Sequence, residues 1–168
     1  MTGVLIRSAE LGAGLGDRSV IADLVLPVFR AGDTYTIDPD ISAQDAVAYW
    51  CAPEKSVFIA QDGAAVLGTY YIRANQAGGG AHVCNCGYIT AEAARGRGVA
   101  RAMLDHSLIT ARAMGFRAMQ YNFVVSTNTR AVDTWTRAGF DTVGRLPAAF
   151  RHPTLGYVDA LVMYRSLV

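Results

Sequence analysis

The chain has 168 residues, of which 52% are hydrophobic and 17% are charged. This length is typical of one domain over residues 1–168, and the apolar content excludes a disordered chain. The net charge of +1, from 15 basic and 14 acidic residues, excludes a strongly basic nucleic-acid-binding protein, which needs many phosphate contacts. Because charged residues fall below the usual share of about 25%, we expect a second copy to cover part of the surface in a homodimer.

Alternating apolar patterns, turn glycines and capping residues divide the chain into strands and helices. In chain order these are a strand at residues 3–9, helices at 17–31 and 42–52, strands at 57–61, 65–73 and 82–90, a helix at 98–114, a strand at 119–125, a helix at 127–138, and strands at 141–146 and 158–164. Asp62-Gly63 is typical of a hairpin turn between two of the strands. The order predicts an α/β fold with a mixed central sheet of about six to seven strands, flanked by about four helices.

The cysteines and the start of the chain indicate a cytoplasmic protein. There are three cysteines, without a Cys-x-x-Cys pair, and the first residues lack the pattern of a secretory signal. No early apolar run is long enough to cross a membrane. Cys84 and Cys86 would share one face of a strand near His82, which is poor geometry for binding one metal ion. We therefore favour small buried side chains there and expect no metal.

The first glycine-rich segment, residues 11–17, resembles a nucleotide-binding loop only superficially. Gly12, Gly14 and Gly16 form Gly-x-Gly-x-Gly, whereas dinucleotide folds use Gly-x-Gly-x-x-Gly. Asp17 would also place a negative charge where the pyrophosphate should lie. We expect a loop that ends in a helix N-cap at Asp17, with a dinucleotide site as the weaker alternative.

The second glycine-rich segment, Arg95-Gly-Arg-Gly-Val-Ala100, leads directly into a predicted helix. Gly96 and Gly98 allow a sharp turn that exposes successive N–H groups. The first N–H groups of the helix lack partners, and the helix dipole is positive at this end. Together these groups form an anion cradle suited to a pyrophosphate, with an ordinary turn into a helix as the alternative.

Two motifs together resemble the GCN5-related N-acetyltransferase (GNAT) superfamily. Arg95-x-x-Gly98-x-Ala100 matches its acyl-CoA signature Gln/Arg-x-x-Gly-x-Gly/Ala, and residues 128–140 resemble its Asn-x-x-Ala block that ends in Gly-Phe. The resemblance implies a GNAT fold and an N-acetyltransferase with acetyl-CoA as co-substrate. The expected partner is a small-molecule amine acceptor, with no nucleic acid and no membrane.

The resemblance also implies roles for individual residues. Backbone groups of the strand before the loop would pair with the pantetheine arm, and the loop would hold the pyrophosphate. The predicted cofactor-binding residues are Tyr88, Ile89, Thr90, Arg95, Gly96, Arg97, Gly98, Val99, Ala100 and Asn128. Arg101 and Arg130 are candidates for the 3′-phosphate.

The sequence departs from the family at the positions expected for the general acid and the general base. Trp135 occupies the position where the family often has a tyrosine that protonates the leaving thiolate, and an indole N–H is no acid at neutral pH. Few glutamates are available as a base, but two amides, Asn85 and Asn122, lie on central strands where asparagine is uncommon. We predict these two as the catalytic residues, with satisfied structural amides as the alternative. Asn85 and the run 121–128 resemble the branch that acetylates azetidine-2-carboxylate, a proline analogue.

Other interpretations of the site remain open. Trp135 and the missing carboxylate are compatible with a non-catalytic acyl-CoA-binding or sensing domain, and the fold also serves protein or peptide N-acetylation. Arg151 and His152 near the end of the chain would bind an acceptor carboxylate or remain solvated. Tyr35 would line the acceptor side or pack in the core.

Overall fold

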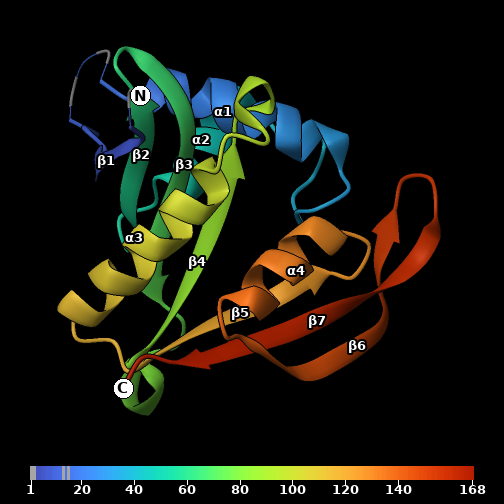
Figure 1. Ribbon diagram of the computed structural model, residues 1–168. Helices are drawn as coiled ribbons and strands as arrows, with labels where there is room; N and C mark the ends of the chain where they lie inside the picture. Colours follow the sequence, from blue (N-terminus) through green and yellow to red (C-terminus); the bar gives the residue numbers. More distant parts are fainter. Residues whose placement is uncertain (1–2, 13, 15) are drawn as a thin grey trace.

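A seven-stranded mixed sheet, in the order β1-β2-β3-β4-β5-β7-β6, forms the centre of the protein. The structure is a computed structural model that describes residues 3–12, 14 and 16–168. The strands are β1 (Leu5–Ser8), β2 (Ser56–Asp62), β3 (Ala65–Ala74), β4 (Val83–Thr90), β5 (Ala118–Val125), β6 (Asp141–His152) and β7 (Gly156–Ser166). The helices are α1 (Arg18–Ala31), α2 (Ala43–Trp50), α3 (Val99–Ala113) and α4 (Thr129–Arg137). Two short 3-10 turns, η1 (Gly78–Gly80) and η2 (Glu92–Ala94), lie between β3 and β4 and between β4 and α3. This arrangement confirms the predicted fold class (Figure 1).

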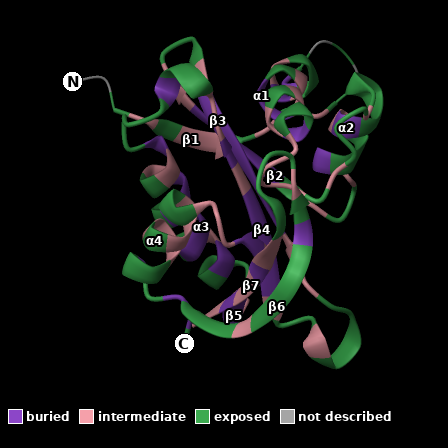
Figure 2. Ribbon diagram, turned by 90° about the vertical axis from the view of Figure 1, so that its right-hand side faces the viewer, coloured by how far each residue is buried: buried purple, intermediate pink, exposed green. Residues whose placement is uncertain are grey.

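Helices cover both faces of the sheet, as Figure 2 shows with α1 and α2 on one side and α3 and α4 on the other. Alternation along the strands divides the apolar side chains between two cores. Ile59 and Tyr71 pack with α1 and α2, whereas Phe58 and Tyr70 pack with α3. Within the described residues, every helix is too short or too polar to cross a membrane.

The C-terminal hairpin is longer than the sequence predicted. Strand β6 continues to His152 because the chain bulges at Pro147 and then returns to its pairing with β7 at Phe150. Proline cannot donate to the ladder, so it marks a bulge here and not the end of the strand. Residues 150–152, which lie beyond the predicted strand at 141–146, are therefore paired in the sheet.

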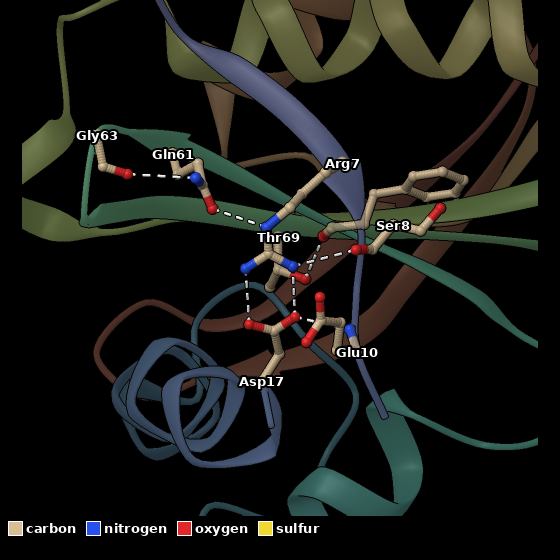
Figure 3. Close-up of polar contacts among 8 residues, drawn as sticks. Arg7, Ser8, Glu10, Asp17, Gln61, Gly63 and Thr69 are labelled. Carbon is tan, nitrogen blue, oxygen red and sulfur yellow. Dashed lines mark hydrogen bonds and ion pairs between the residues drawn. The ribbon is translucent and has the colours of Figure 1, made fainter. Parts of the chain in front are cut away.

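The carboxylate of Asp17 does not cap α1, contrary to our expectation. Asp17 lies at the N-cap position, but its side chain makes no capping bond. It instead accepts hydrogen bonds from Arg7 at 2.6 and 2.9 Å and from the Glu10 N–H at 2.7 Å (Figure 3). Gly16 is required beside it, because a Cβ there would lie 2.5 Å from the Glu10 carbonyl oxygen. The carboxylate thus closes the loop after β1, of which Ala13 and Leu15 lie outside the described residues.

Candidate functional site

Strands β4 and β5 separate soon after they meet. They are parallel neighbours, but they pair only at Val83 with Ala118 and at Cys84 with Met119. Both strands then continue, β4 to Thr90, and they diverge in Figure 1 from a point near the C-terminus. Beyond Cys84, one edge of β4 therefore faces an opening in the sheet.

The alternation of the β3–β4 ladder decides which backbone groups face this opening. The N–H of Ala91 donates to the Leu67 carbonyl of the β3 side at 2.8 Å. In an antiparallel ladder the direction alternates along the strand, so Ile89 also points its N–H and C=O toward β3. Tyr88 and Thr90 point theirs into the opening. Of the three strand residues predicted to bind the pantetheine arm, only these two therefore present their backbone groups to the opening.

The side chain of Tyr88 packs in the core, whereas its main-chain carbonyl lies on the edge of β4 that faces the opening. Its hydroxyl lies 2.7 Å from that of Ser107 and 3.1 Å from that of Tyr121, beneath α3. Burial raises the pKa of Tyr88 well above its usual value, so the phenol stays protonated. On the other side, the Tyr88 carbonyl accepts a hydrogen bond of 3.1 Å from the hydroxyl of Tyr35.

The glycine loop after β4 has the geometry of an anion cradle. Gly96 and Gly98 have φ angles of 78° and 77°, which favour glycine, and no heavy atom lies within 4 Å of a Cβ built on either. Helix α3 follows directly, and its first internal bond joins the Ala102 N–H to the Gly98 carbonyl at 3.0 Å. The N–H groups of the preceding first turn lack helical partners and can bind an anion.

The arginines around the loop divide into two kinds. Arg95 and Arg130 line the groove described below. Arg97 is paired with Asp62 at 3.2 Å, toward the β2–β3 turn, and Arg101 is paired with Asp105 within α3 at 2.9 Å. Arg95 and Arg130 are therefore better placed than Arg97 and Arg101 to meet a bound phosphate.

A groove of about 1200 Å³ runs through the opening between β4 and β5. Its walls come from α1 and the segment after it, β4, the glycine loop, β5 and α4. Neither Arg97 nor the 3′-phosphate candidate Arg101 lines this groove. The structure brings together in it the other residues predicted as catalytic or cofactor-binding: Asn85, Tyr88, Ile89, Thr90, Arg95, Gly96, Gly98, Val99, Ala100, Asn122, Asn128 and Arg130. Asn128 also caps α4 by accepting from the Ala131 N–H at 3.4 Å.

The two predicted catalytic amides belong to one hydrogen-bond network. Asn85 donates to the Gln120 carbonyl at 3.0 Å and accepts from Arg73 Nε at 3.4 Å. Asn122 accepts from the Gln120 side chain at 2.9 Å and donates to Asn75 Oδ1 at 2.6 Å. The network joins β3, β4 and β5 at the point where the sheet opens, and both amides have partners in it.

Trp135 is packed among aromatic rings. Its ring centroid lies 5.0 Å from those of Tyr88 and Tyr121, and Tyr121 stacks on Phe140 at 4.5 Å. Burial raises the pKa of Tyr121 well above its usual value, which keeps this phenol protonated as well. The aromatic cluster shapes the groove beside α4 and supplies no group that ionises near neutral pH.

Two groove residues carry no motif and were missed from the sequence: Arg73 at the end of β3, and Asp33 after α1. The one signal in the sequence for Arg73 is that a charged residue occurs near the end of an otherwise apolar strand. Conversely, the groove lining includes neither Arg151 nor His152, so the hairpin proposed as an acceptor site lies elsewhere. Among the described residues, no cluster of three or more His, Cys, Asp or Glu side chains could hold a metal ion.

Comparisons with known proteins agree with this geometry. A family model described as "Acetyltransferase (GNAT) family" matches residues 24–140. The chain is 30% identical to N-acetyltransferase aca1 of Schizosaccharomyces pombe over 150 residues, covering 78% of this chain and 71% of that protein. It is 39% identical to a GCN5-related N-acetyltransferase from Kribbella flavida, with a TM-score of 0.89 over 97% of each chain. It also shares its fold, at 18% identity, with yncA of Salmonella typhimurium, solved with acetyl-CoA, with a TM-score of 0.83 over 99% of this chain and 95% of that one.

Proposed function

The chain belongs to the acetyltransferase (GNAT) family and is an N-acetyltransferase, and from this premise we propose that it transfers acetyl from acetyl-CoA to the amine of a small molecule. The single observation that carries the proposal is the opening between β4 and β5, with the glycine loop at its end. A long thin co-substrate with a phosphate group at one end fits this groove.

The residues present fit acetyl-CoA. The open space beside Gly96 and Gly98 admits a pyrophosphate to the N–H groups of Gly96 and of residues 98–100, with Arg95 at the rim. The N–H of Arg97 donates to the Ala94 carbonyl instead. The backbone of Tyr88 and Thr90 pairs with the pantetheine arm, and Asn128 contacts the arm from α4. Bound acetyl-CoA supplies the acetyl group as a reactive thioester.

We propose that Asn85 and Asn122 hold the acceptor for direct attack in a ternary complex. The amine nitrogen forms a bond to the acetyl carbon, the bond from this carbon to sulfur breaks, and the proton of the amine passes to solvent. A thiol pKa near 8–9 lets the sulfur leave as a thiolate without a dedicated acid. The protein contributes chiefly by alignment of the two substrates.

The acceptor class that we favour is an amino acid or a proline analogue. Asn85 and the run 121–128 resemble enzymes that acetylate azetidine-2-carboxylate. Asn85 and Asn122 line the groove where the amide network lies. A thiol-release assay over amino acids, polyamines, aminoglycosides and peptides separates the alternatives. A sensing domain would bind acetyl-CoA and release no thiol with any acceptor, and a peptide acetyltransferase would respond to peptides alone.

A matched pair of variants tests the cofactor cradle. Gly98→Asp should weaken acetyl-CoA binding by more than about tenfold, because it places an anion against the pyrophosphate. Gly98→Asn has nearly the same shape and tolerates a positive φ, but it carries no charge, so it should bind far better. Calorimetry measures the acetyl-CoA affinity of the two folded variants. Equal affinities for both would show that the loop does not hold the phosphates.

We propose a cytoplasmic homodimer, with the C-terminal hairpin at the interface. Tyr157 is 71% exposed, and Val143, Leu146 and Leu155 are also exposed apolar residues on or beside this hairpin. Met163 of the same hairpin is apolar as well, but it is fully buried in the core and cannot contribute to this surface. Light scattering at micromolar concentration tests the dimer, and Tyr157→Glu should shift it toward the monomer. The three free, buried cysteines suit a reducing compartment.

A further inference from the structure

A charged side chain lies at the acceptor end of the groove with no anionic partner among the residues that the structure describes. Arg73 pairs with Asn85 across the β3–β4 ladder, and its Nε donates to the Asn85 side-chain oxygen at 3.4 Å. It lines the groove, yet none of the ion pairs between described residues includes it. The two terminal nitrogens of a guanidinium held through Nε form a fork that matches a carboxylate.

The position of Arg73 rules out a role with the phosphates of acetyl-CoA. Its partner Asn85 lies directly after the last β4–β5 backbone pair, Cys84 with Met119. The glycine loop follows the other end of β4, after Thr90. A strand rises about 3.3 Å per residue, so about 16 Å separate Asn85 from that end. Arg73 is therefore at the far end of the groove from the phosphate cradle.

A second cation, Lys55, lies near Arg73. Tyr71, near neighbour of Arg73 on the same face of β3, lines the groove with Tyr49. The ammonium of Lys55 lies over both rings, 3.7 Å from the ring centroid of Tyr49 and 4.3 Å from that of Tyr71. Burial, followed by the positive charge of Arg73, lowers the pKa of Lys55 to about 8, and the nearby Glu54 offsets less of this shift than Arg73 contributes. Two neighbouring cations beside aromatic walls favour an anionic ligand.

The carboxylates of the groove come from other elements. They are Asp23 of α1, Asp33 of the segment after it, and Glu92 of the turn before the glycine loop. None of them is on β3 or β4, the strands that hold Arg73 and Asn85. The sheet side of the acceptor end is thus basic.

We propose that Arg73, oriented by Asn85, binds a carboxylate of the acceptor, so that the substrates are amino acids or other small amines that carry a carboxylate. This inference rests on the proposed transfer to a small amine. It makes Arg73 a residue for substrate specificity, and it gives Asn85, proposed above to hold the acceptor, a second role in positioning Arg73.

The test compares each acid with its own neutral carboxamide. The acceptors are azetidine-2-carboxylate and L-alanine, each beside the corresponding amide, in a thiol-release assay with acetyl-CoA. The wild type should prefer the acids. Arg73→Met should raise KM for the acids by about 10- to 100-fold, with little change in kcat, and should leave the amides and the acetyl-CoA affinity unchanged. Arg73→Lys should lie between the two, because it keeps the charge without the fork.

Arg137→Met is the matched control, since Arg137 is an exposed arginine on α4 that does not line the groove. Equal losses on acids and amides in Arg73→Met, or a wild type that prefers the amides, would overturn the proposal. If no acceptor releases thiol although acetyl-CoA binds, transfer to a small amine fails as a function. Calorimetry of azetidine-2-carboxylate with the CoA complex then decides on Arg73: binding that Arg73→Met abolishes supports the assignment, and absence of binding to the wild type overturns it.

Discussion

Asn85 and Gln120 are joined where β4 and β5 separate: the side-chain amide of Asn85 donates to the main-chain carbonyl of Gln120 at 3.0 Å. The last backbone pair of the two strands, Cys84 with Met119, lies one residue earlier. A side-chain bond thus continues the ladder for one step before the groove begins. This bond fixes the width of the groove at its acceptor end.

Asn85→Ala should therefore affect both stability and turnover. Asn85 is only 7% exposed, and its removal leaves the Gln120 carbonyl without this donor, which costs about 1–3 kcal/mol of the free energy of unfolding. Because Arg73 also loses its partner, kcat/KM should fall further than the lost folded fraction explains, whereas acetyl-CoA affinity should hold. Urea unfolding, calorimetry and turnover on the same preparation check this. A loss of turnover that only follows the loss of stability would assign Asn85 a purely structural role.

Asn122→Ala separates catalysis from the network that holds this amide. A positioned polar group contributes about 10²-fold to a transfer step, so kcat/KM should fall by about that factor with acetyl-CoA affinity unchanged. Asn75→Ala is the control, because Asn75 bonds Asn122 at 2.6 Å but does not line the groove. Asn75→Ala should lower kcat/KM much less than Asn122→Ala does. Similar losses in the two variants would mean that the network matters only as structure.

The ion pair of Arg7 with Asp17 predicts a dependence of stability on pH. The Arg7 guanidinium lowers the pKa of Asp17 below its usual value of 3.8. A lowered pKa in the folded state means that the stabilisation is present above the unfolded pKa and is lost as the pH falls through the folded pKa. Asp17→Asn should thus lower the free energy of unfolding by about 1–3 kcal/mol at neutral pH, and the deficit should shrink below about pH 4.

Urea titrations of Asp17→Asn at several pH values measure this difference. The control is Arg101→Gln, which breaks the exposed pair with Asp105 and should change stability by less than about 0.5 kcal/mol. An Asp17→Asn deficit that is the same at pH 7 and below pH 4 would show that the carboxylate contributes through its shape and not through its charge.

Local sequence signals predicted the helices and strands, and they also led to the proposed cofactor end of the site. The glycine loop, the start of α3 and the motif that begins at Asn128 are each encoded within a few residues, and all three line one groove. The predicted strand boundaries followed the apolar alternation. The exception is β6, which continues past a bulge at Pro147 although the sequence predicted its end at residue 146.

The acceptor end could not be predicted in the same way because it depends on pairing between strands. Arg73 and Asn85 come together only through the β3–β4 register. The same is true away from the groove, where Arg7 meets Asp17 only because the loop after β1 returns to that strand. A charged residue in such a pair carries no local signature. The sequence therefore indicated amides on central strands without showing which groups they orient.

The dependence of turnover on pH tests whether an enzyme base exists. The phenols of Tyr88 and Tyr121 and the thiol of Cys86 have pKa values raised by burial, so none of them becomes a base near neutral pH. An amine attacks only when deprotonated, so kcat/KM should rise tenfold per pH unit from about pH 6 to about pH 9, toward the pKa of the amine itself. Asp33→Asn, at a carboxylate that lines the groove, should leave this profile unchanged. A flat profile in the wild type that becomes steep in Asp33→Asn would identify Asp33 as the base and refute a mechanism without one.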